Sequence, residues 1–160
     1  MRRTVREVAD IDHLADVRDR PVPHDAGMTL THLQPPGLLE VPGLTQMIVA
    51  TGSRTVYISG QTPLTQDGQL IGEGDLGAQA AAVFRNLLTC LDTVGARIGD
   101  VVRTTMYVVD YDAAALDAIY TAAFEVFGEE LPTATSTLVG VSALFHAGQH
   151  FEVDAIAVLD

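Results

Sequence analysis

Apolar residues recur along the chain in two rhythms, which predict strands and helices. Short runs rich in β-branched and apolar residues favour strands, because such side chains suit a pleated, half-buried surface. Longer segments repeat apolar residues every three or four positions, the spacing of one helical face. Strands are expected at 29–33, 46–51, 55–59, 101–109, 136–141 and 150–158. Helices are expected at 76–94 and roughly 113–127.

Capping and turn residues mark the ends of these segments. Asp75 and Asp112 precede the two helices, where an aspartate accepts a hydrogen bond from a first-turn N–H. Gly95 and Gly128 follow them, as expected for a residue that leaves the helical conformation. Gly52-Ser53 lies between the second and third strand segments and predicts a turn that joins them into a hairpin.

The order of the elements, β-β-β-α-β-α-β-β, predicts an α/β sheet with both helices on one side. Residues 1–27 differ from the rest: they hold five of the nine arginines and six acidic residues, interrupted by Pro21-Val22-Pro23. We therefore expect an N-terminal extension at 1–27 and one domain at 28–160. The extension is either a short helix at 5–18 or a solvated tail.

Composition narrows the class of protein. The chain has 160 residues, 48% of them hydrophobic and 19% charged, which suits one folded domain. Its apolar runs fall short of the ~20 residues of a membrane helix, and no apolar stretch follows the N-terminal arginines, so a cytoplasmic protein is expected. The net charge of −12 argues against a nucleic-acid partner, because phosphate binding requires clustered cations.

The absence of one residue type and the scarcity of another exclude some kinds of catalytic site. All nine basic residues are arginines, so no lysine can form a Schiff base or complete a P-loop. The single cysteine, Cys90, lies in an apolar helical pattern and is expected to be a small buried hydrophobe. No cofactor is implied.

The strand at 55–59 runs into Ser59-Gly60-Gln61, and Pro63 follows. A glycine at a strand end lets backbone approach a ligand or a second chain closely. An ordered series of segments extends the pattern: Gly72-Glu73-Gly74-Asp75-Leu76, Gln79, Asn86-Leu87-Leu88, 100–108 and 151–158.

This series resembles the RidA/YjgF/YER057c/UK114 family of small trimeric proteins, whose best-known members are enamine/imine deaminases. The resemblance covers roughly residues 28–160. It implies a chorismate-mutase-like mixed sheet with two helices on one face. It also implies a homotrimer that holds small-molecule ligands in clefts between subunits.

The chain departs from the family at four positions. Catalytic members hold the substrate carboxylate with an arginine, whose place falls on Ser136 here; a shifted register gives Thr133, Ala134 or Thr135, none of them an arginine. Leu138 stands where the family often has Cys or Ser. Leu44 replaces an aromatic residue, and Asp117 replaces an asparagine. These changes argue against a classical 2-imino-acid deaminase.

Other family positions are kept. Ser59 and Gly60 match the strand end that offers backbone groups to the ligand. Glu152 matches the carboxylate that positions or activates water, although a structural carboxylate is the alternative. His150 is a candidate acid/base partner beside Glu152, and Tyr120 is a candidate for lining the pocket.

A metal site is the weaker interpretation of the last strand. His150, Glu152 and Asp154 alternate along one face, with His146 four residues before His150. Such a face also suits any half-exposed strand, so no metal is expected.

Two functions remain open. The first is an enzyme that hydrolyses or tautomerises an imine or enamine-type metabolite, with Glu152 and the changed position Ser136 as its catalytic positions. The second is a non-catalytic trimer that binds a small ligand or regulates a partner or a pathway.

Overall fold

The computed structural model describes residues 27–33, 35–37 and 45–160. Leu44 and residues 1–26, which make up almost all of the expected extension, lie outside the described residues. The elements, in chain order, are β1 (Thr29–Leu33), β2 (Met47–Thr51), β3 (Arg54–Gln61), α1 (Leu76–Thr93), the 3-10 helix η2 (Ile98–Asp100), β4 (Val101–Val109), α2 (Ala113–Phe127), β5 (Thr135–Val141) and β6 (Phe151–Leu159).

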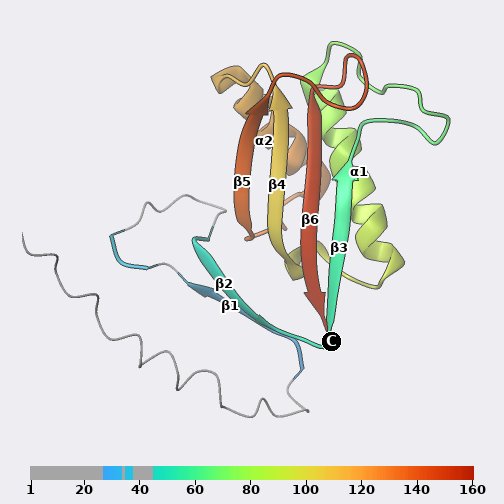
Figure 1. Ribbon diagram of the computed structural model, residues 1–160. Coiled ribbons are helices and arrows are strands. Elements are labelled where there is room, and N and C mark those ends of the chain that lie inside the picture. Colours follow the sequence, from blue (N-terminus) through green and yellow to red (C-terminus); the bar gives the residue numbers. More distant parts are fainter. Residues whose placement is uncertain (1–26, 34, 38–44) are drawn as a thin grey trace, which may run out of the picture.

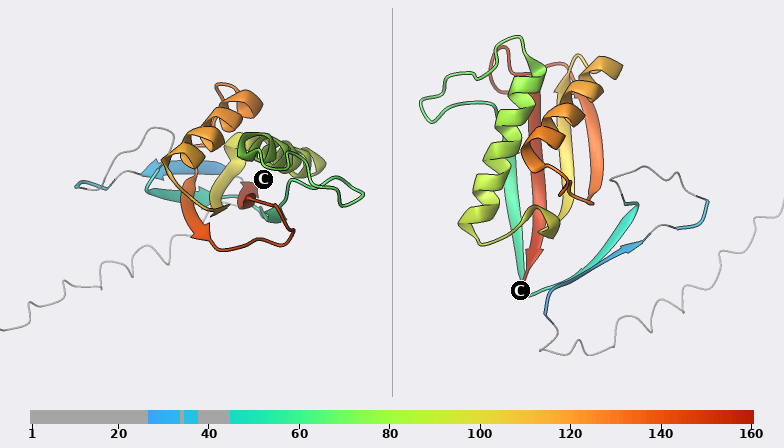
Figure 2. Two further views of the ribbon diagram at one scale, coloured as in Figure 1. Left: turned by 90° about the horizontal axis from the view of Figure 1, so that it is seen from above. Right: turned by 180° about the vertical axis from the view of Figure 1, so that it is seen from behind.

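Four strands form the main sheet, in the order β3-β6-β4-β5. β6 runs antiparallel to both β3 and β4, whereas β4 and β5 are parallel. Both helices cover the same face of this sheet and leave the other face open (Figures 1 and 2). The expected mixed sheet with two helices on one face is therefore confirmed.

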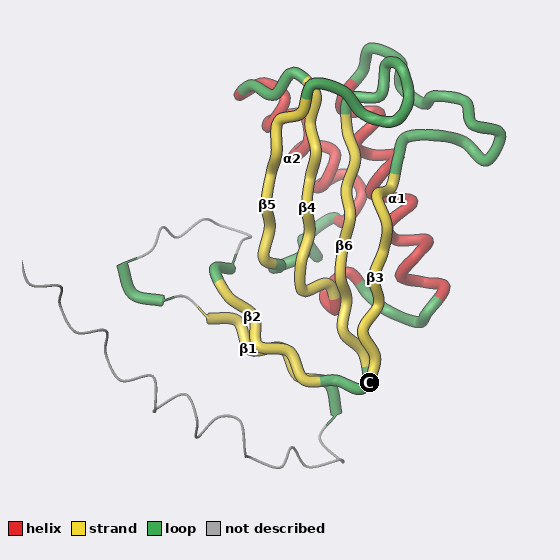
Figure 3. Tube along the Cα trace, in the orientation of Figure 1, coloured by secondary structure: helices red, strands yellow, loops and turns green. Residues whose placement is uncertain are grey.

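The predicted hairpin between the second and third strands is wrong. β2 pairs with β1, from Thr29 opposite Thr51 to Leu33 opposite Met47, and β3 pairs with β6 instead. Figure 3 shows β1 and β2 as a ribbon separate from the main sheet. Gly52 lies beside the end of β6, because a Cβ there would come within 2.5 Å of the Leu159 carbonyl oxygen. The chain thus passes along the end of β6 at the predicted turn.

The core lies between the helices and the sheet. Alternate residues of β6, among them Phe151, Val153 and Ala155, are buried beneath the helices. The Phe84 ring of α1 packs against those of Phe127 and Phe151, with centroids 5.0 and 5.4 Å apart. Burial of this apolar surface is the main stabilising contribution.

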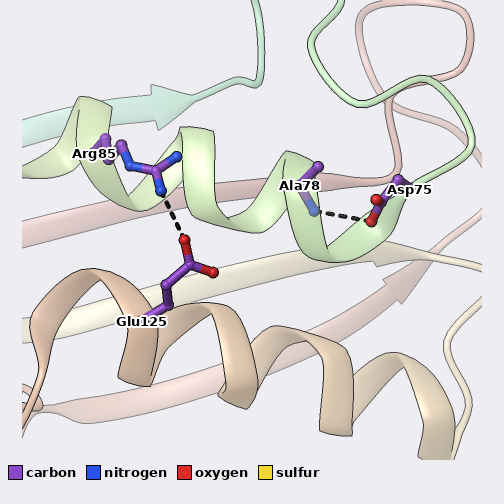
Figure 4. A network of polar contacts seen from close by, with 4 residues as sticks. All are labelled: Asp75, Ala78, Arg85 and Glu125. Carbon is purple, nitrogen blue, oxygen red and sulfur yellow. Dashed lines mark hydrogen bonds and ion pairs between the residues drawn. The ribbon is translucent and has the colours of Figure 1, made fainter.

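Both predicted N-caps are confirmed. Asp75 accepts a hydrogen bond from the Ala78 N–H at 3.0 Å, and Asp112 accepts one from Ala115 at 2.7 Å. On the outer surface an Arg85–Glu125 ion pair joins α1 to α2, at 3.1 Å (Figure 4). An exposed pair of this kind contributes ~0–1 kcal/mol. Packing therefore holds the two helices together.

Gly95 and Gly128 also stand where predicted, just past the helices, with φ of 73° and 63°. This is the left-handed region, which glycine enters without a steric penalty. In the described part of the chain, no helix is both long and apolar enough to span a membrane.

Candidate functional site

A β-bulge stands at the end of β3, where the sequence places Ser59 and Gly60. Ile58 pairs with Ala155 and Gln61 pairs with Val153, so two residues of β3 lie opposite the single residue Asp154. Bulges interrupt the ladder and re-aim nearby groups, and they are frequent beside active sites. The Ser59 carbonyl oxygen accepts a hydrogen bond from the Gln61 side chain at 3.0 Å.

Glu152 lies directly against this bulge. A Cβ built on Gly60 would lie 1.9 Å from Glu152 Oε1, so only glycine lets the carboxylate occupy this place. The other oxygen, Oε2, accepts a hydrogen bond from Gln149 Nε2 at 3.0 Å. The structure thus brings Gly60 and Glu152 together, two residues that are far apart in the sequence.

Sequence reasoning missed Gln149. It lies in the loop before β6, and only 2% of its surface is exposed. Its Oε1 accepts a hydrogen bond from the His146 N–H at 3.2 Å, and its Nε2 also approaches the Phe151 carbonyl oxygen at 3.3 Å. The only signal available was its place three residues before Glu152, in a loop without periodicity.

His150 precedes β6, and its backbone is fixed. Its N–H donates to Gln79 Oε1 at 2.7 Å, and its carbonyl oxygen accepts from the Val109 N–H at 3.0 Å. Gln79 is fully buried and also donates to the carbonyl oxygens of Gly72 and Gly148. No hydrogen bond joins the His150 ring to Glu152, so the structure supplies no contact for an acid/base pair between them.

A second region lies on the face of the sheet that the helices cover. A partly open cavity of about 510 Å³ lies between α2 and the sheet, and Ser136, Leu138 and Tyr120 are among the residues that line it. Thr104 Oγ1 donates a hydrogen bond to Ser136 Oγ at 2.9 Å. Asp117 is exposed on α2 and is not among the lining residues.

The cavity wall is apolar and carries no formal charge. Its lining consists of Phe84, Leu87, Thr104, Met106, Tyr111, Leu116, Ile119, Tyr120, Ala123, Phe124, Phe127, Leu131, Pro132, Ala134, Ser136, Leu138 and Val153. Phe124 is 58% exposed and Tyr120 is 43% exposed. The aromatic rings of α2 therefore reach both the cavity and the protein surface.

The two regions lie on opposite faces of one sheet. Met106 stands beside both Leu138 and Val153 and lines the cavity with them, whereas its neighbour Tyr107 stands beside Glu152. Successive residues of a strand point to opposite faces. Glu152 therefore points to the face that the helices leave open.

The register also gives the separation of the two regions. Ser136 of β5 pairs with Thr104 of β4, and Thr104 pairs with Ala155 of β6. Ala155 lies three positions along β6 from Glu152. At ~3.3 Å per residue and ~4.8 Å per strand spacing, the Cα atoms of Ser136 and Glu152 are about 14 Å apart. The predicted site residues therefore do not form one pocket within a single chain.

The open face carries a further polar contact near Glu152. The Tyr107 hydroxyl donates to Asp154 Oδ2 at 3.0 Å. This hydrogen bond raises the pKa of Tyr107, and burial and the charges of Asp154 and Glu152 act in the same direction. Among the described residues, no group of three or more His, Cys, Asp or Glu side chains could hold a metal ion.

Comparison with known proteins gives the family. The profile of the family described as Endoribonuclease L-PSP matches residues 43–159. The chain is 33% identical over 78 residues to a RutC family protein of Pyrococcus abyssi, a match that covers 48% of this chain and 59% of that protein. It is 32% identical over 104 residues to the 2-iminobutanoate/2-iminopropanoate deaminase of Salmonella typhimurium, which covers 64% of this chain and 78% of that enzyme.

A solved structure agrees with these matches. A conserved Rid family protein of unknown function from Yersinia pestis superposes with a TM-score of 0.73 and 31% identity, over 81% of this chain and 98% of that one. The fold, the family profile and the similar proteins all indicate the same family. The chain belongs to the RidA/YjgF/UK114 family.

Proposed function

We propose that this protein acts on a small imine or enamine that lacks a carboxylate, in a cleft between two subunits of a homotrimer. Glu152 is the acid/base group of a hydrolysis or tautomerisation. The observation that carries the proposal is the Ser136–Thr104 hydroxyl pair. It stands in an apolar cavity at the place where catalytic relatives are expected to have an arginine.

The separation of the two regions supports a cleft between subunits. A small ligand cannot touch Ser136 and Glu152 of one chain, because they lie on opposite faces of the sheet. In a cyclic oligomer, one surface of each subunit meets a different surface of the next. The cavity of one subunit would then face the bulge of its neighbour.

The cavity chemistry supports a substrate without a carboxylate. A carboxylate that enters an apolar site without a cation loses its hydration and gains no charge-assisted hydrogen bond. The hydroxyl pair offers one neutral hydrogen-bonding position, and Leu138 and the aromatic residues of α2 offer apolar contact. An uncharged or cationic ligand with an apolar body fits this wall best.

Glu152 can perform the proton transfers. As a base it takes a proton from water, whose oxygen attacks the carbon of the protonated imine to give a neutral carbinolamine. Glu152 then returns this proton to the carbinolamine nitrogen. The C–N bond breaks as the hydroxyl group loses its own proton to solvent, which releases a carbonyl compound and an amine or ammonia. In a tautomerisation, the same carboxylate moves a proton between carbon and nitrogen.

A matched pair of imines tests the substrate class. Flavin oxidases generate the imines of phenylalanine and of phenylethylamine in situ, and the two differ only by the carboxylate. We expect the protein to accelerate ammonia release from the phenylethylamine imine and not from the phenylalanine imine. Glu152→Gln should abolish the acceleration, and Ser136→Arg should shift the preference toward the carboxylate. Faster release from the phenylalanine imine by the unaltered protein would contradict the proposal.

The apolar wall, which has no charged group of its own, also suits a non-catalytic binding protein. Calorimetry with phenylethylamine, a stable analogue of the imine, separates this second function from the first. Binding of phenylethylamine without conversion of its imine would favour the binding protein. Binding that survives Glu152→Gln, together with loss of turnover, would favour the enzyme.

Mixed trimers test the shared cleft. Ser136→Trp fills the cavity and Glu152→Gln removes the carboxylate, so each variant alone should be inactive. If the cleft joins two chains, each site needs an unaltered Ser136 from one subunit and an unaltered Glu152 from its neighbour. Random mixing of the two variants in equal amounts then restores about a quarter of the sites. If both groups acted from one chain, mixing would restore none.

A further inference from the structure

We propose that Gln149 is the positioning residue of Glu152, which it holds against the β3 bulge in the orientation needed for proton transfer. The proposal rests on the proposed role of Glu152 as the acid/base group. Gln149 acts through Glu152, and its own amide has no titratable proton to exchange with a substrate.

The hydrogen bonds of Gln149 fix which end of its amide faces Glu152. The His146 N–H is a donor, so the atom that it approaches at 3.2 Å must be the amide oxygen, Oε1. The NH2 group then points to the other side, where it meets Glu152 Oε2 at 3.0 Å. The loop backbone thus selects the donor end of Gln149 for the carboxylate.

The carboxylate is held from two sides. Oε2 is held by Gln149, and Oε1 lies against Gly60, where a Cβ would come within 1.9 Å. One oxygen is fixed by a hydrogen bond and the other by close contact with the strand. A carboxylate held in this way keeps one orientation, which a freely rotating glutamate side chain would not.

The loop that carries Gln149 is itself anchored. Gln79, which is fully buried, donates to the Gly148 carbonyl oxygen at 2.8 Å and accepts from the His150 N–H at 2.7 Å. These two contacts hold the residues on either side of Gln149. Because Gln149 is only 2% exposed, water cannot readily replace its hydrogen bond to Glu152.

The Gln149→Glu variant removes the orienting contact to Glu152, together with the longer contact of Nε2 with the Phe151 carbonyl oxygen. A glutamate has the same shape and can still accept from the His146 N–H, but it places an oxygen where the donor was. With the imine of phenylethylamine as probe, we expect kcat to fall roughly tenfold to a hundredfold, with KM changed less than about threefold. Gln69→Glu adds the same charge at an exposed turn and is expected to leave kcat unchanged.

A swap separates orientation from folding. In the double variant Gln149→Glu/Glu152→Gln, the donor and the acceptor exchange places and the hydrogen bond can form again. We expect the melting temperature, lowered by about 2–4 °C in Gln149→Glu, to recover in part in the double variant while turnover stays lost, because the contact with the Phe151 carbonyl oxygen is not restored. This recovery needs no substrate, so it tests the contact even if the proposed reaction is wrong.

The outcomes are distinguishable. Full activity of Glu152→Gln would overturn the proposed function. Recovery of stability in the swap would, in that case, still support the contact between the two side chains. A Gln149→Glu variant with unchanged kcat, or a swap that recovers no stability, would overturn the role of Gln149.

Discussion

Replacement of Gly60 by alanine tests the proposed site most directly, because the structure gives the size of the perturbation. The new Cβ would lie 1.9 Å from Glu152 Oε1 and 2.8 Å from its Cδ. Ordinary van der Waals contact begins near 3.4 Å, so Oε1 must move by about 1.5 Å. The group that moves is the end of a flexible side chain, so the backbone can stay in place.

The expected result is a large loss of activity with a small loss of stability. A misplacement of about 1 Å at a reacting group can cost roughly a hundredfold in rate. The stability change combines a lost Glu152–Gln149 hydrogen bond, about 1 kcal/mol, with a partly offsetting gain from reduced freedom of the unfolded chain. A net change below about 1 kcal/mol corresponds to less than about 4 °C in melting temperature.

The assay compares kcat for the imine of phenylethylamine with the melting temperature of the same preparation. Gly99→Ala is the matched control, because a Cβ there meets nothing within 4 Å and its φ is not in the left-handed region. It should leave kcat unchanged and raise the melting temperature only slightly, through the same reduced freedom of the unfolded chain. Full activity of Gly60→Ala would refute the claim that the position of Glu152 matters, and unfolding of this variant would refute the claim that only a side-chain end moves.

Three further changes have defined outcomes. Gln79→Met removes three buried hydrogen bonds, including the one from His150, and should cost about 3–5 kcal/mol of unfolding free energy by urea titration. Asp112→Ala removes the N-cap of α2 and should cost about 1 kcal/mol by the same titration. The raised pKa of Tyr107 means that its bond to Asp154 stabilises the fold below the ordinary tyrosine pKa of about 10, and that this contribution is lost as pH rises through the raised value. Absorbance at alkaline pH should therefore show one late-titrating tyrosine that is absent in Tyr107→Phe.

Local signals in the sequence predicted the elements of the fold well. Asp75 and Asp112 cap the helices because their side chains reach N–H groups only three residues away. The hairpin at Gly52 failed because the choice of partner strand is not local: β3 gains a longer pairing with β6 than β2 could offer. A turn signal in the sequence shows where the chain bends, but it does not show which strand the next segment pairs with.

The arrangement of the candidate site residues could be predicted only in part, for a similar reason. The family resemblance places Gly60 and Glu152 in one site, and the structure brings these two residues into contact. Whether Ser136 shares a face with Glu152 depends on the register between strands, which no pattern within one strand reveals. Gln149 lies in a loop, where no periodic spacing marks a buried side chain.

The order of the sheet leaves β5 as one of its two edges. Its seven residues, TSTLVGV, include no charged side chain and no proline, the devices that usually keep an edge strand from pairing with another chain. Its unpaired backbone groups can therefore template the addition of a further strand. In the proposed homotrimer, a mutation that weakens association between subunits should first appear as aggregation on dilution, detected by light scattering, before any loss of secondary structure.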